Sequence, residues 1–326
     1  MRIVVLAGGV GGSRFLLGVR AWARAEEAAG RGRHELTAVI NTGDDMWLTG
    51  LRITPDLDSV LYTLAGVNDT ERGWGRAGET ERVSAELDAW GVGWPWFTLG
   101  DLDLGAHIAR SSWLRAGIPL HEVVARMSQR WELGVRLLPA TNDEVETRVV
   151  TDSGELHFQE WWTRHRAALP ARSFRHPGLE SARPAPGVLD AIAAADVVLL
   201  APSNPVVSIG PIVAIPGTRE ALATTTAPVI GVSPIIGGAV VRGMADACLT
   251  AIGVETDAAA VALHYGARHP AHGSAPGLLD GWLVDEVDAA GVAPLVATGI
   301  RTRAVPLWMR DLDTSAALAA EAIALV

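Results

Sequence analysis

Residues 1–15 read MRIVVLAGGVGGSRF, and this stretch decides the fold class. The apolar, β-branched run from Ile3 to Ala7 is typical of a strand that is buried on both faces of a parallel sheet. Glycines follow at once, and because they lack a Cβ they allow a tight turn in which a ligand can approach the main chain. A helix beginning near Ser13 would direct its free N–H groups at an anion. The stretch therefore predicts a phosphate-binding turn with Arg14 as the nearest cation, and its glycines are Gly8, Gly9, Gly11 and Gly12.

Two common phosphate-binding motifs are absent. The dinucleotide fingerprint GxGxxG requires a glycine where the chain has Arg14, and an acidic residue where the next predicted strand, LTAVIN, ends in Asn41. A P-loop requires a lysine, and the sequence contains none. A dinucleotide-dependent oxidoreductase is therefore the weakest functional alternative. The structural alternative is a tight strand-to-helix turn that binds no ligand.

The composition excludes several classes of protein. With 326 residues, 49% of them hydrophobic, the chain can bury a large core. A net charge of −10 argues against nucleic acid or an anionic membrane as partner, because both require clustered cations. No apolar run approaches membrane length, and we expect no signal peptide. The single cysteine, Cys248, cannot form an intramolecular disulfide, which favours a cytoplasmic location. We expect a homodimer, because that is the commonest assembly.

The alternation of strand and helix predicts an α/β fold. Buried strands at 196–201 (DVVLLA) and 228–233 (PVIGVS) are each followed by a loop and a helix, as at the N-terminus. We therefore predict a doubly wound, mostly parallel Rossmann-like sheet formed by residues 1–66 and 188–326. Residues 67–187 are predicted to be an insertion, with three amphipathic helices in 68–135 and then a small antiparallel covering sheet.

Four aspartates are expected to meet near the glycine turn. Asp44 and Asp45 follow the second predicted strand, while Asp56 and Asp58 open a predicted helix. Ligands of open parallel sheets bind beyond the carboxyl ends of the strands, where both segments would lie. Four carboxylates would repel a phosphate unless a hard cation lies between them, which predicts Mg²⁺. Helix capping and an Asx turn would explain one or two of these aspartates.

Loops rich in small donors follow two further strands, and three such loops in one sheet favour a ligand site. Their candidate nucleotide-binding residues are Ser203, Asn204, Ser208, Gly210, Ser233 and Gly237.

Aromatic residues in the loops of the insertion are free to flank a flat ligand, although plugs in a helical core are an equal alternative. They are Trp74, Trp94, Trp96 and Phe97. His107, one turn into a predicted helix, is expected to be solvated.

The chain resembles the 2-phospho-L-lactate transferases of coenzyme F(420) biosynthesis, especially their actinobacterial, phosphoenolpyruvate-using branch. The resemblance runs along the whole chain in GGVGGSRFLLGV, NTGDDMW, TPDLDSVLYTL, LGDLDLGAHI, APSNPVVSIGPI and VSPIIGG. It implies an enzyme in which the ribityl hydroxyl of the deazaflavin Fo attacks a guanosine-diphosphate-activated phospholactate or phosphoenolpyruvate. GMP then leaves, and a phosphodiester forms with the help of Mg²⁺.

The resemblance also implies roles for particular residues. Asp58 and Thr98 fall where the family contacts the deazaflavin, and we assign Asp45 and Asp58 to the metal and to proton transfer. The loops after the later strands would hold the guanosine diphosphate, and Gly8 to Gly12 the transferred phosphate. Two positions depart from the family. Thr98 stands where many members have lysine, and Leu102 stands where arginine is usual. An arginine contact there would therefore come from elsewhere, for example from Arg110, or be absent.

The alternative from another class is a nucleotide-binding regulatory protein without catalysis. Such a sensor needs no second substrate pocket, so binding of the nucleotide without binding of the deazaflavin would favour it.

Overall fold

The computed structural model describes residues 1–92, 95–271 and 275–326. Its centre is a parallel sheet of seven strands in the order β14-β13-β10-β9-β1-β2-β5. The strands are β1 (Arg2–Ala7), β2 (Glu35–Ile40), β5 (Arg136–Pro139), β9 (Val197–Leu200), β10 (Val229–Val232), β13 (Gly281–Val284) and β14 (Arg301–Ala304). The chain runs outward from β1 in both directions, so the strand order reverses between β1 and β9. In open α/β sheets, ligands bind at this switch point.

Successive side chains of β1 enter different cores. Ile3 and Val5 belong to one apolar cluster, whereas Val4 and Leu6 belong to the other, and all four are at most 2% exposed. Each such side chain contributes about 1.5–3 kcal/mol when it is fully buried. The first cluster is covered by α1 (Gly9–Ala28), α2 (Pro55–Ala65) and α12 (Leu312–Ile323). The second is covered by α6 (Val188–Ala193), α7 (Gly210–Ala214), α8 (Thr218–Thr224), α9 (Ala245–Ala251), α10 (Ala258–Tyr265) and α11 (Val292–Ala297). Helices on both faces confirm the doubly wound α/β prediction.

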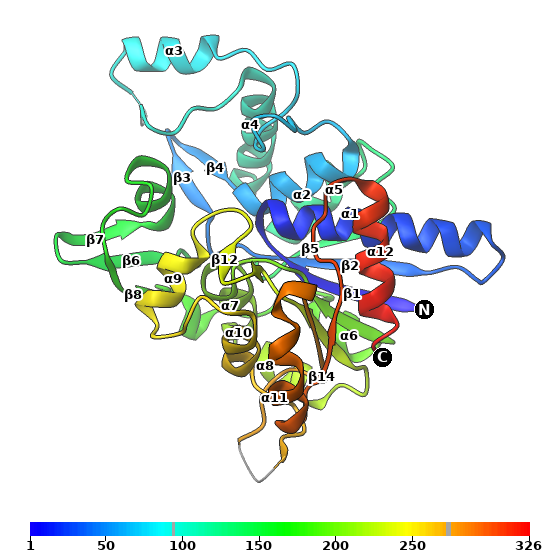
Figure 1. Cartoon of the computed structure of the whole chain (residues 1–326). Helices are drawn as coiled ribbons and strands as arrows, with labels where there is room; N and C mark the ends of the chain where they lie inside the picture. Colours follow the sequence, from blue (N-terminus) through cyan, green and yellow to red (C-terminus); the bar gives the residue numbers. More distant parts are fainter. Residues whose placement is uncertain (93–94, 272–274) are drawn as a thin grey trace.

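The segment between α2 and α6 carries the predicted three helices, α3 (Arg82–Ala89), α4 (Asp101–Arg115) and α5 (Leu120–Ser128). Figure 1 shows α3 at the outer end of this segment, above α4. The small antiparallel sheet is also present, with β6 (Arg148–Thr151) paired to β7 (Gly154–His157) and β8 (Ala171–Arg175). One expectation is wrong, because β5 does not join that antiparallel sheet. It pairs in parallel with β2 instead, so residues 67–187 supply a strand to the central sheet.

Two short hairpins complete the described strands. They are β3 (Met46–Leu48) with β4 (Leu51–Ile53), and β11 (Ile235–Ile236) with β12 (Ala239–Val240). The short helical segments are η1 (Glu160–Arg164), η2 (Leu179–Ser181), η3 (Pro205–Ile209) and η5 (Glu286–Gly291). Across the described ranges, no single helix has the length and hydropathy to cross a membrane, while one pair bent by 85°, Pro205–Ala214 with Thr218–Thr224, meets that criterion by length and composition.

Candidate functional site

The glycine turn lies at the switch point, as predicted, but helix α1 begins at Gly9 rather than near Ser13. Gly9 has a φ of +64°, a conformation that favours glycine. The later glycines are required by close packing. A Cβ on Gly12 would lie 2.5 Å from the Ser203 Oγ, and one on Gly11 would lie 2.7 Å from the Pro202 carbonyl oxygen. The turn after β1 therefore packs directly against the loop after β9.

Two N–H groups of this turn are already bound to protein acceptors. Gly8 donates to the Ser203 Oγ at 3.1 Å, and that hydroxyl donates back to the Gly8 carbonyl oxygen at 2.7 Å. Gly9 donates to Asp56 Oδ1 at 2.7 Å. The Asp56 carboxylate thus occupies an anion position at the start of α1. The next N–H groups of the first helical turn have no acceptor within the helix and remain available to a ligand.

Asn41 connects two of the four aspartates. Its Nδ2 donates to Asp56 Oδ2 at 2.9 Å and to Asp44 Oδ1 at 3.4 Å, and its Oδ1 accepts from the Gly43 N–H at 2.9 Å. Burial, followed by the charges of Asp56 and Asp45, raises the pKa of Asp44. Burial also raises the pKa of Asp56 to about 6, against the hydrogen bonds from Asn41 and Gly9. The capping alternative is therefore wrong in detail. The Asx-type contact is made by Asn41, which accepts from Gly43, and the Asp56 carboxylate accepts from Gly9 of α1 rather than capping its own helix.

Asp45 is the most buried of the four aspartates. Its side chain is fully buried, and neither of its oxygens has a hydrogen-bond partner among the described residues. The nearest cation is Arg52, whose Nη2 lies 3.6 Å from Asp45 Oδ2. Burial raises the pKa of Asp45 to about 8, although Arg52 and Arg110 act in the opposite direction. A buried carboxylate without donors is costly, and a bound cation would satisfy it.

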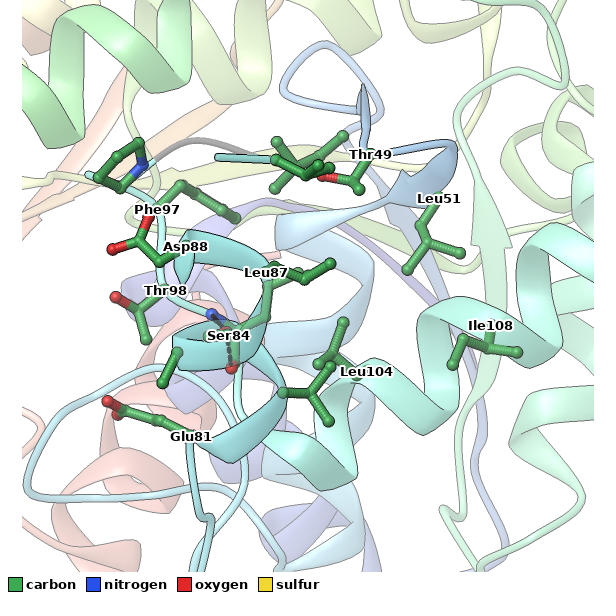
Figure 2. Close-up of a pocket in the computed structure, with 16 residues that line it drawn as sticks. Thr49, Leu51, Glu81, Ser84, Leu87, Asp88, Phe97, Thr98, Leu104 and Ile108 are labelled. Carbon is green, nitrogen blue, oxygen red and sulfur yellow. Dashed lines mark hydrogen bonds between the residues drawn. The ribbon is translucent and has the colours of Figure 1, made fainter. Parts of the chain in front are cut away.

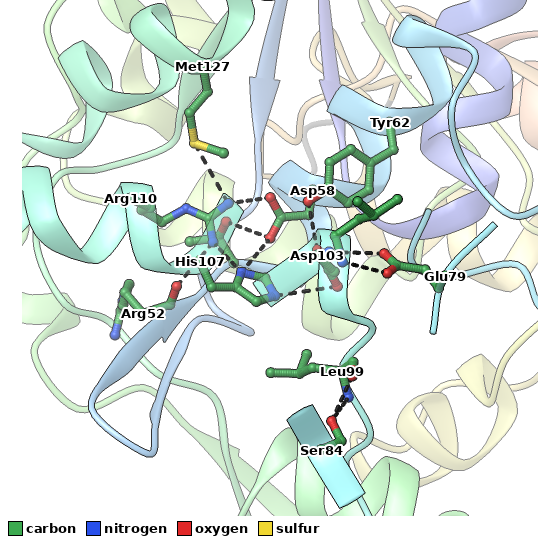
Figure 3. A network of polar contacts seen from close by, with 12 residues as sticks. Arg52, Asp58, Tyr62, Glu79, Ser84, Leu99, Asp103, His107, Arg110 and Met127 are labelled. Atoms are coloured by element: carbon green, nitrogen blue, oxygen red, sulfur yellow. Dashed lines mark hydrogen bonds and ion pairs between the residues drawn. The ribbon is translucent and has the colours of Figure 1, made fainter. Parts of the chain in front are cut away.

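Asp58, on α2, takes part in a buried network with side chains of α4 (Figure 3). It is hydrogen-bonded to Arg110 and accepts from the Thr54 Oγ1 at 3.2 Å. Figure 3 shows the His107 ring between Asp58 and Asp103. Its Nδ1 lies 3.7 Å from Asp58 Oδ2, and its Nε2 lies 3.3 Å from Asp103 Oδ2. One ligand atom each from Asp58, Asp103 and His107 lies within 4.8 Å of the others, close enough to share a metal ion.

The arginine and histidine of this network are more buried than the sequence suggested. His107 and Arg110 are each 1% exposed, so the expectation that His107 is solvated is wrong. Burial acts to lower the pKa of Arg110, but the interactions with Asp58, Tyr62 and Asp45 together outweigh burial, and the net pKa is raised. Burial acts to raise the pKa of Asp103, but His107, the Tyr62 hydroxyl and Arg110 together bring it below the usual value. The spacing of 103, 107 and 110 on one helical face was the signal in the sequence for this network.

Thr98 does not share a cavity with Asp58. It lines an apolar cavity of about 500 Å³ between the β3-β4 hairpin, α3 and α4 (Figure 2). Figure 2 shows Thr98 and Glu81 at one side of this cavity, and Leu51 and Ile108 at the other. Asp58 is not among the described residues that line it.

The predicted aromatic residues differ in position. Phe97 lines this cavity, and its ring packs edge-on against Trp96 with 6.0 Å between the ring centres. Trp74 is exposed in the loop after α2, and Trp94 lies outside the described residues.

The later loops are only partly brought to the glycine turn. Ser203 and Ser208 reach it, since a Cβ on Gly8 would lie 2.8 Å from the Ser208 Cβ. The Asn204 side chain instead caps η3 by accepting from the Val206 and Val207 N–H groups, and Gly210 begins α7. The Ser233 hydroxyl binds the backbone of Ile235, and the Gly237 N–H donates to the Asp288 carboxylate at 3.0 Å. These groups are therefore already bound to protein partners, Ser233 and Asn204 within their own loops and Gly237 to Asp288 of η5.

The fold and this site define an α/β protein of the doubly wound class, with buried aspartates gathered near its switch point. Comparison with known families agrees: residues 3–296 match the family described as 2-phospho-L-lactate transferase CofD. The chain belongs to this family.

A protein of Thermobifida fusca named phosphoenolpyruvate transferase is 55% identical to this chain, over 99% of this chain and 97% of its own length. A protein of Streptomyces coelicolor with the same name is 54% identical over 100% of this chain and 98% of its own. Among solved structures, a member of the upf0052 family from Bacillus halodurans matches with a TM-score of 0.61. At 17% identity, covering 98% of this chain and 99% of that one, it supports the fold alone.

Proposed function

We propose that this protein transfers a phosphoenolpyruvyl group from its guanosine-diphosphate-activated form to the ribityl hydroxyl of the deazaflavin Fo, in coenzyme F(420) biosynthesis. The single observation that carries the proposal is the full-length identity of 55% to a protein named phosphoenolpyruvate transferase. The hydroxyl oxygen attacks the phosphorus that bears the acid. The bond from that phosphorus to the oxygen of the GMP phosphate breaks, GMP leaves, and the hydroxyl proton passes to a base.

The proposal places this chemistry at the switch point. The first turn of α1 offers N–H groups to the transferred phosphate, and Ser203 and Ser208 lie against the turn that presents them. Phosphoryl transfer depends mainly on positioning and on neutralising charge, so a preorganised cradle suits it. The nucleotide is assigned to the loops after β9 and β10.

The metal and base roles stay with Asp45 and Asp58 as a proposal. Two observations support a cation here: the buried oxygens of Asp45 lack partners, and Asp58 lies in a group of ligand atoms within 4.8 Å of one another. Mg²⁺ bound there would neutralise charge on the phosphate oxygens. Asp58, whose carboxylate is oriented by Arg110 and Thr54, is assigned to accept the hydroxyl proton.

The deazaflavin ring is assigned to the cavity lined by Thr98. Its volume of about 500 Å³ falls within the range of roughly 300–1,000 Å³ that is typical of small-molecule sites. Its wall of leucine and phenylalanine side chains suits a flat apolar ring. A threonine in place of the family's usual lysine provides a hydroxyl rather than a charge. A homodimer, predicted from the sequence, is kept as part of the proposal.

The test is a transfer assay with purified protein, Fo, activated phosphoenolpyruvate and Mg²⁺, in which product and GMP are separated by chromatography. We expect one GMP released for each Fo converted, and loss of turnover with a chelator. Asp45→Asn and Asp58→Asn should each lower kcat at least tenfold, with Asp190→Asn, an exposed position, as the control. Normal turnover of both site variants would refute the metal assignment. Nucleotide binding without Fo binding or turnover would instead favour the regulatory alternative.

A further inference from the structure

A second cavity, of about 130 Å³, lies beside the glycine turn between α1, α2 and the loop at 68–75. One face of α1 contributes Val10, Ser13, Arg14 and Leu17 to it. These positions are spaced as neighbours on one helical face. The cavity is therefore built into the groove between α1 and α2.

The cavity starts close to the glycine turn. Asp56 of α2 binds the Gly9 N–H, and Ser59, one turn further along α2, already lines the cavity. At a rise of 1.5 Å per residue, the separation along the helix is roughly 5 Å. A phosphate held by the first turn of α1 would thus have the cavity within reach of its substituent.

The charge of the cavity is the reverse of that at the switch point. Arg14 is the one charged side chain among the described residues that line it; it is exposed, and the described chain offers it neither an ion pair nor a hydrogen bond. Arg242 approaches from outside, where a Cβ on Gly73 would lie 2.7 Å from its Cζ, and its Nη2 donates to the Arg72 carbonyl oxygen at 3.4 Å. The other polar groups that line the cavity are hydroxyls and an amide, from Ser13, Ser59, Thr63, Asn68 and Thr70.

We propose that this cavity binds the carboxylate of the transferred three-carbon acid, with Arg14 as its charged partner. The inference rests on the proposed function and adds the subsite that recognises the acid. The acid carries its own negative charge, and a carboxylate is held best where a cation faces it, which the aspartates near the glycine turn do not provide and Arg14 does. The Arg14 cavity offers a cation and neutral donors about one helical turn away.

The size of the cavity selects among the anionic parts of the donor. At about 130 Å³ it is well below the roughly 300–1,000 Å³ of sites that enclose larger ligands, and it matches a small carboxylic acid better than a nucleoside. The transferred phosphate is held by the helix N-terminus in the proposed function. The carboxylate and the carbons that carry it are the remaining part of suitable size and charge.

The experiment measures the coupling between Arg14 and the carboxylate. Wild type and Arg14→Gln are each assayed with activated phosphoenolpyruvate and with a donor in which the carboxylate is replaced by a carboxamide. Arg24→Gln, which removes an exposed arginine further along α1, is the matched control. Arg14→Lys tests whether a charge alone rescues binding, and titration with GDP measures the nucleotide contacts separately. Thermal unfolding verifies that each variant is folded.

A hydrogen bond to a charged group predicts a loss of roughly tenfold to hundredfold in kcat/KM for the carboxylate donor in Arg14→Gln. The Kd for GDP and the KM for Fo should stay within about twofold. The wild type should prefer the carboxylate donor to the carboxamide donor by a similar factor, and Arg14→Gln should not distinguish them.

An equal loss with both donors, a matching rise in the GDP Kd, or no loss at all would overturn the inference while leaving the transferase activity intact. If the wild type shows no turnover with either donor, the proposed function fails, and the inference fails with it.

Discussion

Replacing Asp45 by asparagine should stabilise the metal-free protein at alkaline pH. Burial raises the pKa of Asp45 to about 8 in the folded chain, against an ordinary value of 3.8. The folded state therefore holds a proton that the unfolded state releases between these two values. The stability that this proton contributes is fully present below about pH 4 and is lost as the pH rises through about 8.

The size of the effect follows from the pKa difference. Each pH unit is worth about 1.36 kcal/mol, so the wild type should lose roughly 3 kcal/mol more than Asp45→Asn between about pH 5.5 and about pH 8. Urea denaturation in the presence of a chelator measures this difference at both pH values. Asp190→Asn, which removes an exposed carboxylate, is the control and should follow the wild type.

Adding Mg²⁺ gives an independent check. At about a hundred times its Kd, a ligand that binds only the folded state adds about 2.7 kcal/mol, and the wild type should gain this while Asp45→Asn gains much less. Equal pH dependence in the wild type and Asp45→Asn would refute the reasoning from burial. Equal stabilisation of both by Mg²⁺ would refute the assignment of Asp45 to the metal.

Three further substitutions test the packing of the site and its surroundings. Gly12→Ala should lower the free energy of unfolding by about 1–3 kcal/mol in urea denaturation, because its Cβ would lie 2.5 Å from the Ser203 Oγ. Gly105→Ala is the control, since a Cβ there meets nothing within 4 Å and should be neutral or stabilising. Arg110→Met should cost about 3–5 kcal/mol, measured in the same way, because it leaves the buried Asp58 without its cation; an unchanged stability would show that Asp58 is not charged. Trp161→Ala should lower the free energy of unfolding by about 3–5 kcal/mol, since its ring is fully buried and its Nε1 donates to the Leu169 carbonyl oxygen at 2.7 Å.

The sequence predicted the central sheet well because its signals are local. The run from Ile3 to Ala7 and the glycines after it are sufficient to predict a buried strand, a turn and a helix, and the same pattern returns at β9 and β10. The strand β5 was assigned to the wrong sheet. It has four residues, RLLP, which are too few for periodicity to distinguish a parallel edge strand from an antiparallel one. The pairing with β2 depends on tertiary contacts.

The site was predicted less completely because its key contacts join distant segments. The Asp56 side chain is bound by Gly9, 47 residues away, and by Asn41, so a local capping rule misjudged it. Arg110 and Asp58 are 52 residues apart. Residue types at the right spacing indicated that aspartates would gather, but they gave no information on which carboxylate would be left without partners, as Asp45 is.

Helix α4 borders both the acidic network and the large cavity. Its residues 103, 107 and 110 contact or lie beside the Asp58 carboxylate, while Leu104 and Ile108, on the adjacent face, line the cavity next to Thr98. Because α4 is one continuous helix, a shift of the part that lines the cavity also moves the residues that contact Asp58. A bulkier side chain at the buried Leu104 would therefore press on the helix that also carries Arg110. The shape of the cavity and the position of the side chains around Asp58 are therefore mechanically connected through this one helix.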